Sequence, residues 1–233
     1  PSSPKRSKTN CSRVRKAKKV LSLVKRVKKA LMRALGIQTA TEAGEATLLI
    51  GLRNPGAKYA GTRHNIGADA VAVVADRIPA SFRSAPRGIP AQVADGRMGD
   101  SRVRLAMPTT FMNESGQAVG PLIRYFTPDS FIVAHDDIDL AFGTMRIHHG
   151  RGSGGHNGIK SIVDTTGGTE FWRLRIGVGR PPGRMDPADF VLQRFSADEE
   201  AEILVQEAAD VLEAFVAGGV EAARQAAGDL KRG

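Results

Sequence analysis

Amide side chains and a histidine occur in this sequence at a few places where strands end or helices begin. The stretch "NPGAKYAGTRHNIG", residues 54–67, places two asparagines and His64 directly after an apolar run. Outside the N-terminal tail the chain has four asparagines: Asn54, Asn65, Asn113 and Asn157. An asparagine offers one carbonyl acceptor and two N–H donors without titrating, which suits binding a peptide-like carbonyl or a ribose hydroxyl and holding a developing oxyanion. His64 adds a base that titrates near neutral pH.

An aspartate in another loop completes this set of polar residues. Asp136 lies in "AHDDID", at the end of an apolar stretch. If its carboxylate reaches one ring nitrogen of His64, it would fix the tautomer and stabilise the imidazolium formed on deprotonating water. Loops at the carboxyl ends of strands in an open α/β sheet are where ligands bind, so we expect these residues to share one cleft. They predict a hydrolase without a covalent nucleophile, although each asparagine taken singly also suits a helix N-cap or a turn.

Two other catalytic interpretations rest on weaker patterns. "GRGSGG", residues 150–155, fits the G-x-G-x-x-G spacing of a dinucleotide-binding turn, but the next strand candidate leads to Arg180 and not to an acid for a ribose diol. Asp136, Asp137 and Asp139 could hold Mg²⁺ for a phosphohydrolase, yet no other carboxylate-rich strand end joins them. The sequence contains neither a P-loop nor a G-x-S-x-G nucleophile motif.

The charge of the chain is concentrated near its N-terminus. The formal net charge is +10, but residues 1–40 contain thirteen Lys or Arg and no acid, so residues 41–233, with 21 basic and 24 acidic side chains, have a net charge of −3. Overall charge therefore gives no evidence that the folded part binds nucleic acid. The single cysteine, Cys11, excludes an internal disulfide and a cysteine-based zinc site and favours a reducing compartment. No apolar stretch approaches the roughly 18 residues of a membrane span, so we expect a soluble protein.

Residues 1–45 form a separate basic extension in this interpretation. Apolar residues recur there at helical spacing, with lysines and arginines in the gaps: Val20, Val24, Val27, Leu31 and Leu35. A basic amphipathic helix of this kind suits an RNA-binding or ribosome-binding arm, a membrane-surface helix or an organellar targeting segment. An unstructured, solvated tail is an equally good interpretation, because such dense like charges destabilise an isolated helix.

Strands and helices alternate along the rest of the chain. The strand candidates are short apolar runs at residues 46–52, 102–107, 130–134, 145–149 and 172–178. Helical periodicity appears at residues 66–78, 115–126 and 156–165. A last long helix is expected to begin at Ser196, where Ser196 and Glu199 form a capping-box pattern. This order predicts an α/β fold with a largely parallel or mixed sheet covered by helices on both faces.

The body of the chain resembles bacterial-type peptidyl-tRNA hydrolases. The likeness runs from about Thr47 to the C-terminal helix, in the family's order and spacing, through "IGLRNPGAKYAGTRHNIG", "PTTFMNESGQAV", "VAHDDIDLAFG", "GSGGHNGIKSI", "FWRLRIGVGRP" and "DPADFVLQRF". The resemblance implies one monomeric globular domain over residues 46–233, with a twisted mixed sheet and helices on both faces. It also implies cytoplasmic, metal-free and cofactor-free cleavage of the ester joining a peptide to the terminal ribose of tRNA, which recycles tRNA from prematurely released peptidyl-tRNA.

The resemblance also implies a role for each residue of the candidate site. It makes His64 the general base and Asp136 the carboxylate that supports its basic form. It implies that Asn54 orients the substrate and distinguishes a blocked peptidyl group from a free aminoacyl group. Further contacts with the substrate or the tRNA end are implied for Asn113, Asn157, Tyr59 and Phe111.

One position departs from the family pattern. The family clamps the 5′ phosphate of tRNA between a lysine and an arginine; Arg175 in "WRLR" matches the arginine, but His148 stands at the lysine position. A mostly neutral imidazole binds phosphate more weakly than an ammonium, so either Arg146 or Arg151 substitutes for the lysine or the clamp is weaker. The basic extension would then compensate by raising nonspecific affinity for tRNA. Two alternatives stay open: a catalytically inactive RNA-binding module of the same fold, and an organellar homologue with the extension as its targeting peptide.

Overall fold

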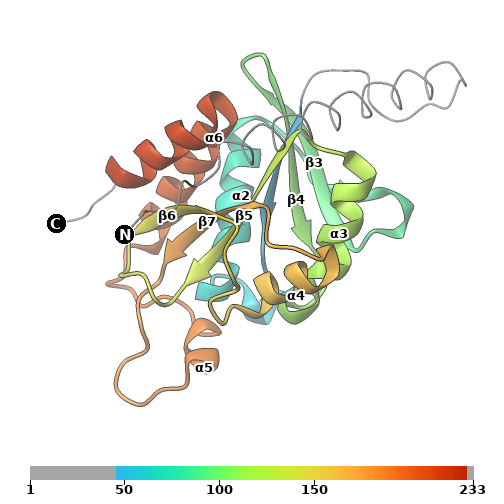
Figure 1. The fold of residues 1–233 in the computed structure, drawn as a ribbon. Helices are drawn as coiled ribbons and strands as arrows, with labels where there is room; N and C mark the ends of the chain where they lie inside the picture. The colour runs from blue at the N-terminus through green and yellow to red at the C-terminus, as the bar shows by residue number, and fades with distance from the viewer. Residues whose placement is uncertain (1–45, 230–233) are drawn as a thin grey trace, which may run out of the picture. The chain divides into compact units, whose positions relative to one another are not determined.

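A mixed β-sheet runs through the centre of the residues that this computed structural model describes, 46–229 (Figure 1). The basic extension expected over residues 1–45 lies outside them. Within the described range the sheet has seven strands: β1 (Ala46–Gly51), β2 (Arg83–Ser84), β3 (Ala91–Met98), β4 (Ser101–Pro108), β5 (Ser130–Asp137), β6 (Met145–His149) and β7 (Trp172–Gly177).

The strands pair in the order β2-β3-β4-β1-β5-β7-β6. β1 pairs in parallel with β4 and β5, and β5 pairs in parallel with β7. The outer pairs, β2 with β3, β3 with β4 and β6 with β7, are antiparallel. The mixed sheet expected from the sequence is confirmed, and its four parallel strands end at one common edge.

Helices cover both faces of the sheet, as the sequence predicts. α2 (Ile66–Arg77) and α6 (Ala201–Asp229) pack on one face, and α3 (Ser115–Phe126) and α4 (Asn157–Thr166) pack on the other (Figure 1). The short helix α5 (Pro187–Val191) precedes α6. Single 3₁₀ turns lie in the loops: η1 (Ala57–Tyr59), η2 (Arg63–Asn65), η3 (Pro86–Gly88) and η4 (Met112–Glu114). None of the helices in the described part of the chain has the length and apolar character needed to cross a bilayer.

Side chains of the central strands alternate between two apolar layers. Leu49 of β1 belongs to the layer under α2 and α6, whereas Leu48 and Ile50 belong to the layer under α3 and α4. All three are at most 1% exposed. A strand covered on both faces is apolar at successive positions, which explains the continuous apolar run "LLI" at residues 48–50. Burial of each of these side chains contributes about 1.5–3 kcal/mol.

Gly67, in the first turn of α2, allows this helix to approach the sheet closely. A Cβ atom at this position would lie 2.1 Å from the main-chain oxygen of Ala134 in β5. A Cβ atom at Gly51 of β1 would likewise lie 2.4 Å from the main-chain oxygen of Gly67. Both distances are too short for any side chain. The two glycines therefore place the start of α2, and with it His64, against the end of β5, where Asp136 lies.

The last helix begins later than the capping-box pattern predicts. The Glu199 carboxylate accepts hydrogen bonds from the main-chain N–H and the hydroxyl of Ser196, at 2.6 and 2.8 Å. The first helical residue, however, is Ala201. The same Glu199 oxygen also accepts a 2.6 Å hydrogen bond from Arg63. This turn is therefore tied to the residues next to His64 and does not start the helix.

Candidate active site

A cavity of about 670 Å³ lies where the loops after β1, β4 and β5 meet. This is the carboxyl edge of the parallel strands, where open α/β folds bind their ligands. Seven residues singled out in the sequence line it: Asn54, Tyr59, His64, Phe111, Asn113, Asp136 and Asn157. Arg175, the eighth candidate, is not among the lining residues. The predicted convergence of distant loops on one cleft is thus found in the structure.

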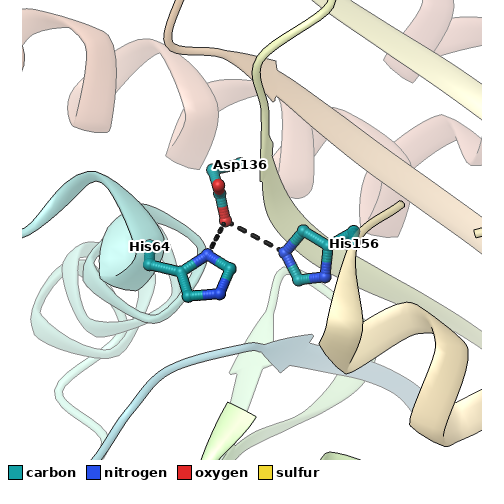
Figure 2. A group of neighbouring side chains, drawn as sticks. All are labelled: His64, Asp136 and His156. Atoms are coloured by element: carbon teal, nitrogen blue, oxygen red, sulfur yellow. Dashed lines mark hydrogen bonds and ion pairs between the residues drawn. The ribbon is translucent and has the colours of Figure 1, made fainter. Parts of the chain in front are cut away.

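His64 and Asp136 form a buried pair at the base of this cavity (Figure 2). Nδ1 of His64 lies 2.8 Å from Oδ1 of Asp136, and the two side chains are 10% and 3% exposed. His156 approaches the same oxygen from another side, with its Nε2 atom 3.0 Å away (Figure 2). The sequence placed His156 in the "GGHNG" loop but did not identify it as a functional residue.

The hydrogen bonds around His156 determine where its proton lies. Nδ1 of His156 accepts from the main-chain N–H groups of Gly158 and Ile159, at 3.1 and 3.3 Å, and so caps the N-terminus of α4. Nε2 must therefore carry the ring proton, which it donates to Asp136. Because the carboxylate accepts from His64 as well, Nδ1 of His64 is protonated. The lone pair of His64 is then left on Nε2, in the position of a general base.

The pKa of Asp136 lies well below its ordinary range. Burial alone would raise it, but the interactions with His156 and His64 outweigh this effect and lower the pKa. The carboxylate is therefore ionised at neutral pH and acts as an acceptor for both histidines. One negative charge supports two imidazole rings, which is the arrangement needed to stabilise a positive charge that forms briefly on His64.

His64, Asp136 and His156 can each offer one ligand atom such that the three atoms lie within 4.8 Å of one another, close enough to share a metal ion. Ligation through Nε2 of His156 requires this atom to release its proton. The proton would move to Nδ1 and break the cap of α4, where Nδ1 accepts two N–H groups. The donor chemistry therefore favours hydrogen bonding within this group of three residues over metal ligation.

Asn54 and Asn65 fix the shape of the loop between β1 and α2. Asn65 bridges the main chain of Asn54: its Oδ1 accepts from the Asn54 N–H at 2.8 Å, and its Nδ2 donates to the Asn54 carbonyl at 3.0 Å. Oδ1 of Asn54 accepts from the main-chain N–H of Met112 at 2.8 Å. This bond leaves the Nδ2 group of Asn54 for the cavity. Asn65 is thus buried support rather than a lining residue, a role that the sequence did not indicate.

Aromatic and amide side chains form the open rim of the cavity. Phe111 is 50% exposed, and its ring lies 6.4 Å from that of Tyr59 in an edge-to-face arrangement. Asn113 in η4 and Asn157 at the start of α4 are also exposed. An aromatic ring with a free face offers a platform on which a nucleotide base can stack.

The glycine-rich loop at residues 150–155 serves the same cavity and does not form a dinucleotide-binding turn. β6, the strand before it, is antiparallel to its neighbour, so the loop lies outside the parallel βαβ unit that a dinucleotide fold requires. The buried guanidinium of Arg173 donates to the carbonyl of Gly152 at 2.7 Å and to that of Arg151. Arg173 therefore holds the loop that leads to His156, another supporting role that the sequence did not indicate.

Arg175 of β7 lies beside His148 of β6. Its NH1 group donates to Nδ1 of His148 at 3.0 Å, and its Nε donates to Asp137. Burial, followed by the nearby Arg175 and Arg151, lowers the pKa of His148, so this ring is neutral. Arg146 of β6 is paired with Arg175 across the two strands and is exposed. Arg146 is therefore an available cation next to Arg175, whereas His148 is neutral.

The fold and the site together define an enzyme with an α/β fold in which a buried histidine–aspartate pair and several amide groups line one cavity. The sequence model of the peptidyl-tRNA hydrolase family matches residues 48–232. The chain belongs to the peptidyl-tRNA hydrolase family.

Known relatives and solved structures agree with this assignment. The chain is 46% identical over 184 residues to the peptidyl-tRNA hydrolase of Mycolicibacterium smegmatis, which covers 77% of this chain and 96% of that protein. The identity and coverage are the same for the enzyme of Mycobacterium tuberculosis. The crystal structure of peptidyl-tRNA hydrolase from Acinetobacter baumannii superposes with a TM-score of 0.74 at 33% identity, covering 82% of this chain and 98% of that chain.

Proposed function

We propose that this chain hydrolyses the ester bond between a peptide and the terminal ribose of tRNA, and that residues 46–233 form the hydrolase domain. The observation that carries the proposal is the 2.8 Å contact between His64 and Asp136 in a cavity lined by three asparagines. With Nδ1–H held by the carboxylate, Nε2 of His64 is free to take a proton from water. The products are a released peptide and a tRNA that can be charged again.

The reaction needs one addition and one elimination. Nε2 of His64 takes a proton from water while the water oxygen bonds to the ester carbonyl carbon. The carbonyl oxygen becomes an oxyanion, and Nδ2–H groups of Asn54 and Asn113 donate to it. The bond to the ribose oxygen then breaks, and this oxygen takes the proton back from His64. Asp136 stabilises the charge on His64 between the two steps.

These groups suffice for an ester that is already activated. A positioned general base contributes roughly 10²–10⁴-fold to a rate, and each oxyanion donor contributes about 10²–10³-fold. The proposed mechanism therefore requires no cofactor, because every proton is moved by His64.

Asn54 is the residue suited to selecting a blocked peptidyl group. Its Oδ1 is occupied by the main-chain N–H of Met112, so its Nδ2 group can only donate into the cavity. A peptidyl substrate presents an additional carbonyl, that of its last peptide bond, whereas a free aminoacyl group presents an ammonium. A donor at Asn54 favours the carbonyl and disfavours the ammonium.

We propose that Arg175 and Arg146 together bind the 5′ phosphate of the tRNA. They are neighbours across β7 and β6, and both carry a permanent charge. His148 lies next to Arg175 as a neutral acceptor and is not the phosphate ligand in this proposal.

The basic extension, residues 1–45, is proposed to raise nonspecific affinity for RNA or the ribosome through the thirteen Lys or Arg within residues 1–40. The test compares the salt dependence of tRNA binding for the full chain and for a chain that lacks these residues. An unchanged slope removes the proposal.

We further propose that the enzyme works as a monomer in the cytoplasm. All the side chains proposed to act on the substrate come from one chain, so the site needs no second copy. Its substrate forms where ribosomes translate, and the single cysteine suits a reducing compartment. Light scattering of the purified protein measures the first point, and imaging of the tagged chain measures the second.

The decisive experiment measures peptide release from N-acetyl-aminoacyl-tRNA and from the same tRNA with a free amino group. We expect rapid release of the blocked amino acid and little release of the free one. A protein that binds tRNA tightly but cleaves neither substrate would instead be the catalytically inactive binding module.

A further inference from the structure

Arg63 precedes His64 in the chain, yet its side chain makes its hydrogen bonds with another part of the molecule. NH1 donates to the main-chain carbonyls of Arg194, at 2.8 Å, and Gln193, at 3.3 Å. NH2 donates to the carboxylate of Glu199 at 2.6 Å. Arg63 is only 6% exposed. The planar guanidinium reaches these acceptors from two nitrogen atoms in a fixed geometry, which the single nitrogen of an ammonium group does not reproduce.

Aromatic rings of the same segment enclose the guanidinium of Arg63. Its central carbon lies 4.2 Å from the ring centroid of Phe190 and 5.0 Å from that of Phe195. The main chain adds a bridge between Thr62 and Arg194 and a hydrogen bond from the N–H of Arg63 to Gln193. These contacts all join the turn before His64 to residues 190–199, which link α5 to α6.

The segment that Arg63 holds continues into one wall of the active-site cavity. The cavity lining also includes four residues in α5 and directly after it: Pro187, Ala188, Val191 and Leu192. Figure 1 shows α5 at the lower end of the molecule, well away from the body of α6. The wall is therefore attached to the catalytic turn through the contacts of Arg63.

We infer that Arg63 is a positioning residue for the peptide part of the substrate. It fixes the apolar wall formed by Val191 and Leu192 at a set distance from His64, so that a peptide chain lies along this wall while its ester faces the base. The inference rests on the proposed function. The hydrogen bonds of the Arg63 side chain go to residues 193–199 and not to the His64–Asp136 pair, so loosening the wall weakens peptide binding more than it slows the chemical step.

The kinetic test uses Arg63→Met, Arg63→Lys and the partner variant Glu199→Gln, with Arg77→Met as the matched control. Arg77 also holds α6 through carboxylates, but on the surface, away from the cavity. Each variant is assayed with N-acetyl-aminoacyl-tRNA and with a tRNA that carries a peptide of several residues. We expect Arg63→Met to raise KM about tenfold for the longer substrate, with kcat and the short substrate changed less than about threefold.

Tryptic cleavage after Arg194 provides a second measurement that does not depend on activity. Arg194 is exposed, but its carbonyl is held by Arg63. The rate at which the fragment beginning at Phe195 appears should rise at least severalfold in Arg63→Met, less in Arg63→Lys and Glu199→Gln, and not in Arg77→Met.

Equal losses of kcat/KM for both substrates, or a fall in kcat with unchanged KM, would overturn the inference, since a merely structural role has this effect. If the unmodified chain cleaves neither substrate, the proposed function fails. In that case an unchanged rate of tryptic cleavage after Arg194 in Arg63→Met overturns the inference that Arg63 holds this segment, and a faster rate supports it.

Discussion

Replacing Asp136 by asparagine removes one negative charge from the site and leaves its shape almost unchanged. The charge lies 2.8 Å from Nδ1 of His64, beside the imidazolium that forms when this ring takes a proton from water. At an effective dielectric constant near 20, two unit charges about 4 Å apart interact by about 4 kcal/mol. Since about 1.36 kcal/mol changes a rate tenfold, we expect kcat to fall about 10³-fold in Asp136→Asn.

A second effect of the asparagine acts in the same direction. Its amide group can accept from one histidine through oxygen but presents N–H groups to the other, so His64 or His156 loses its acceptor. In a protease triad the corresponding exchange lowers kcat about 10⁴-fold because the histidine takes the wrong tautomer. The expected loss of kcat in Asp136→Asn therefore lies between about 10³-fold and 10⁴-fold.

The assay for Asp136→Asn is release of labelled amino acid from N-acetyl-aminoacyl-tRNA at saturating substrate and pH 7.5. Asp139→Asn is the matched control, because Asp139 is exposed, pairs with Arg180 and does not line the cavity. We expect the control to keep full activity and KM to change little in both variants. A kcat for Asp136→Asn within tenfold of the unmodified enzyme would refute the claim that this charge supports the base.

Three other substitutions test local contacts. Burial raises the pKa of Asp69 to about 6 despite the opposing effect of Arg53, so the ionised carboxylate disfavours folding at pH 7.5. Asp69→Asn should therefore raise the free energy of unfolding, measured by urea denaturation, by about 1–3 kcal/mol at pH 7.5. Below about pH 4 the carboxyl is protonated in both the folded and the unfolded chain, so the substitution should leave the free energy of unfolding unchanged. Asn54→Asp keeps an oxygen for the N–H of Met112 but loses both donors, so kcat/KM for the blocked substrate should fall at least about 10²-fold; an unchanged kcat/KM would show that this amide makes no contact in the transition state. Arg146→Gln should lower the slope of log affinity for tRNA against log salt by about one, and an unchanged slope would place the phosphate elsewhere.

The fold could be predicted from the sequence wherever a segment is apolar in one clear period. The predicted bounds of the helix at residues 115–126 and of the strand at residues 145–149 agree with α3 and β6. β3 was missed because Asp95 and Gly96 interrupt the alternation of apolar residues in "AQVADGRM". The strand is formed by its antiparallel pairing with β4, which its own sequence does not reveal. β2 has two residues and shows no pattern of its own.

The candidate site was predictable by residue type, and the sequence suggested Asp136 as the partner of His64 without showing that their two loops meet. His64 and Asp136 stand out as a base and a carboxylate after strands, yet their 2.8 Å contact depends on the close approach of α2 and β5 at Gly67. His156 was missed because it resembles an ordinary cap residue in the sequence, and Asn65 was expected in the cleft but instead supports the main chain of Asn54. Their roles depend on which residues their side chains hydrogen-bond, Asp136 for His156 and the main chain of Asn54 for Asn65, and tertiary structure alone sets these contacts.

The most direct test of the account measures kcat for His64→Gln on N-acetyl-aminoacyl-tRNA in EDTA. His149→Gln is the control, since His149 is an exposed histidine of β6 outside the cavity. The account predicts that the unmodified enzyme and the control keep their rates in EDTA, and that His64→Gln loses about 10²–10⁴-fold. Substantial activity in His64→Gln, or loss of the unmodified enzyme's activity on chelation, would contradict the proposal that His64 activates water without a metal.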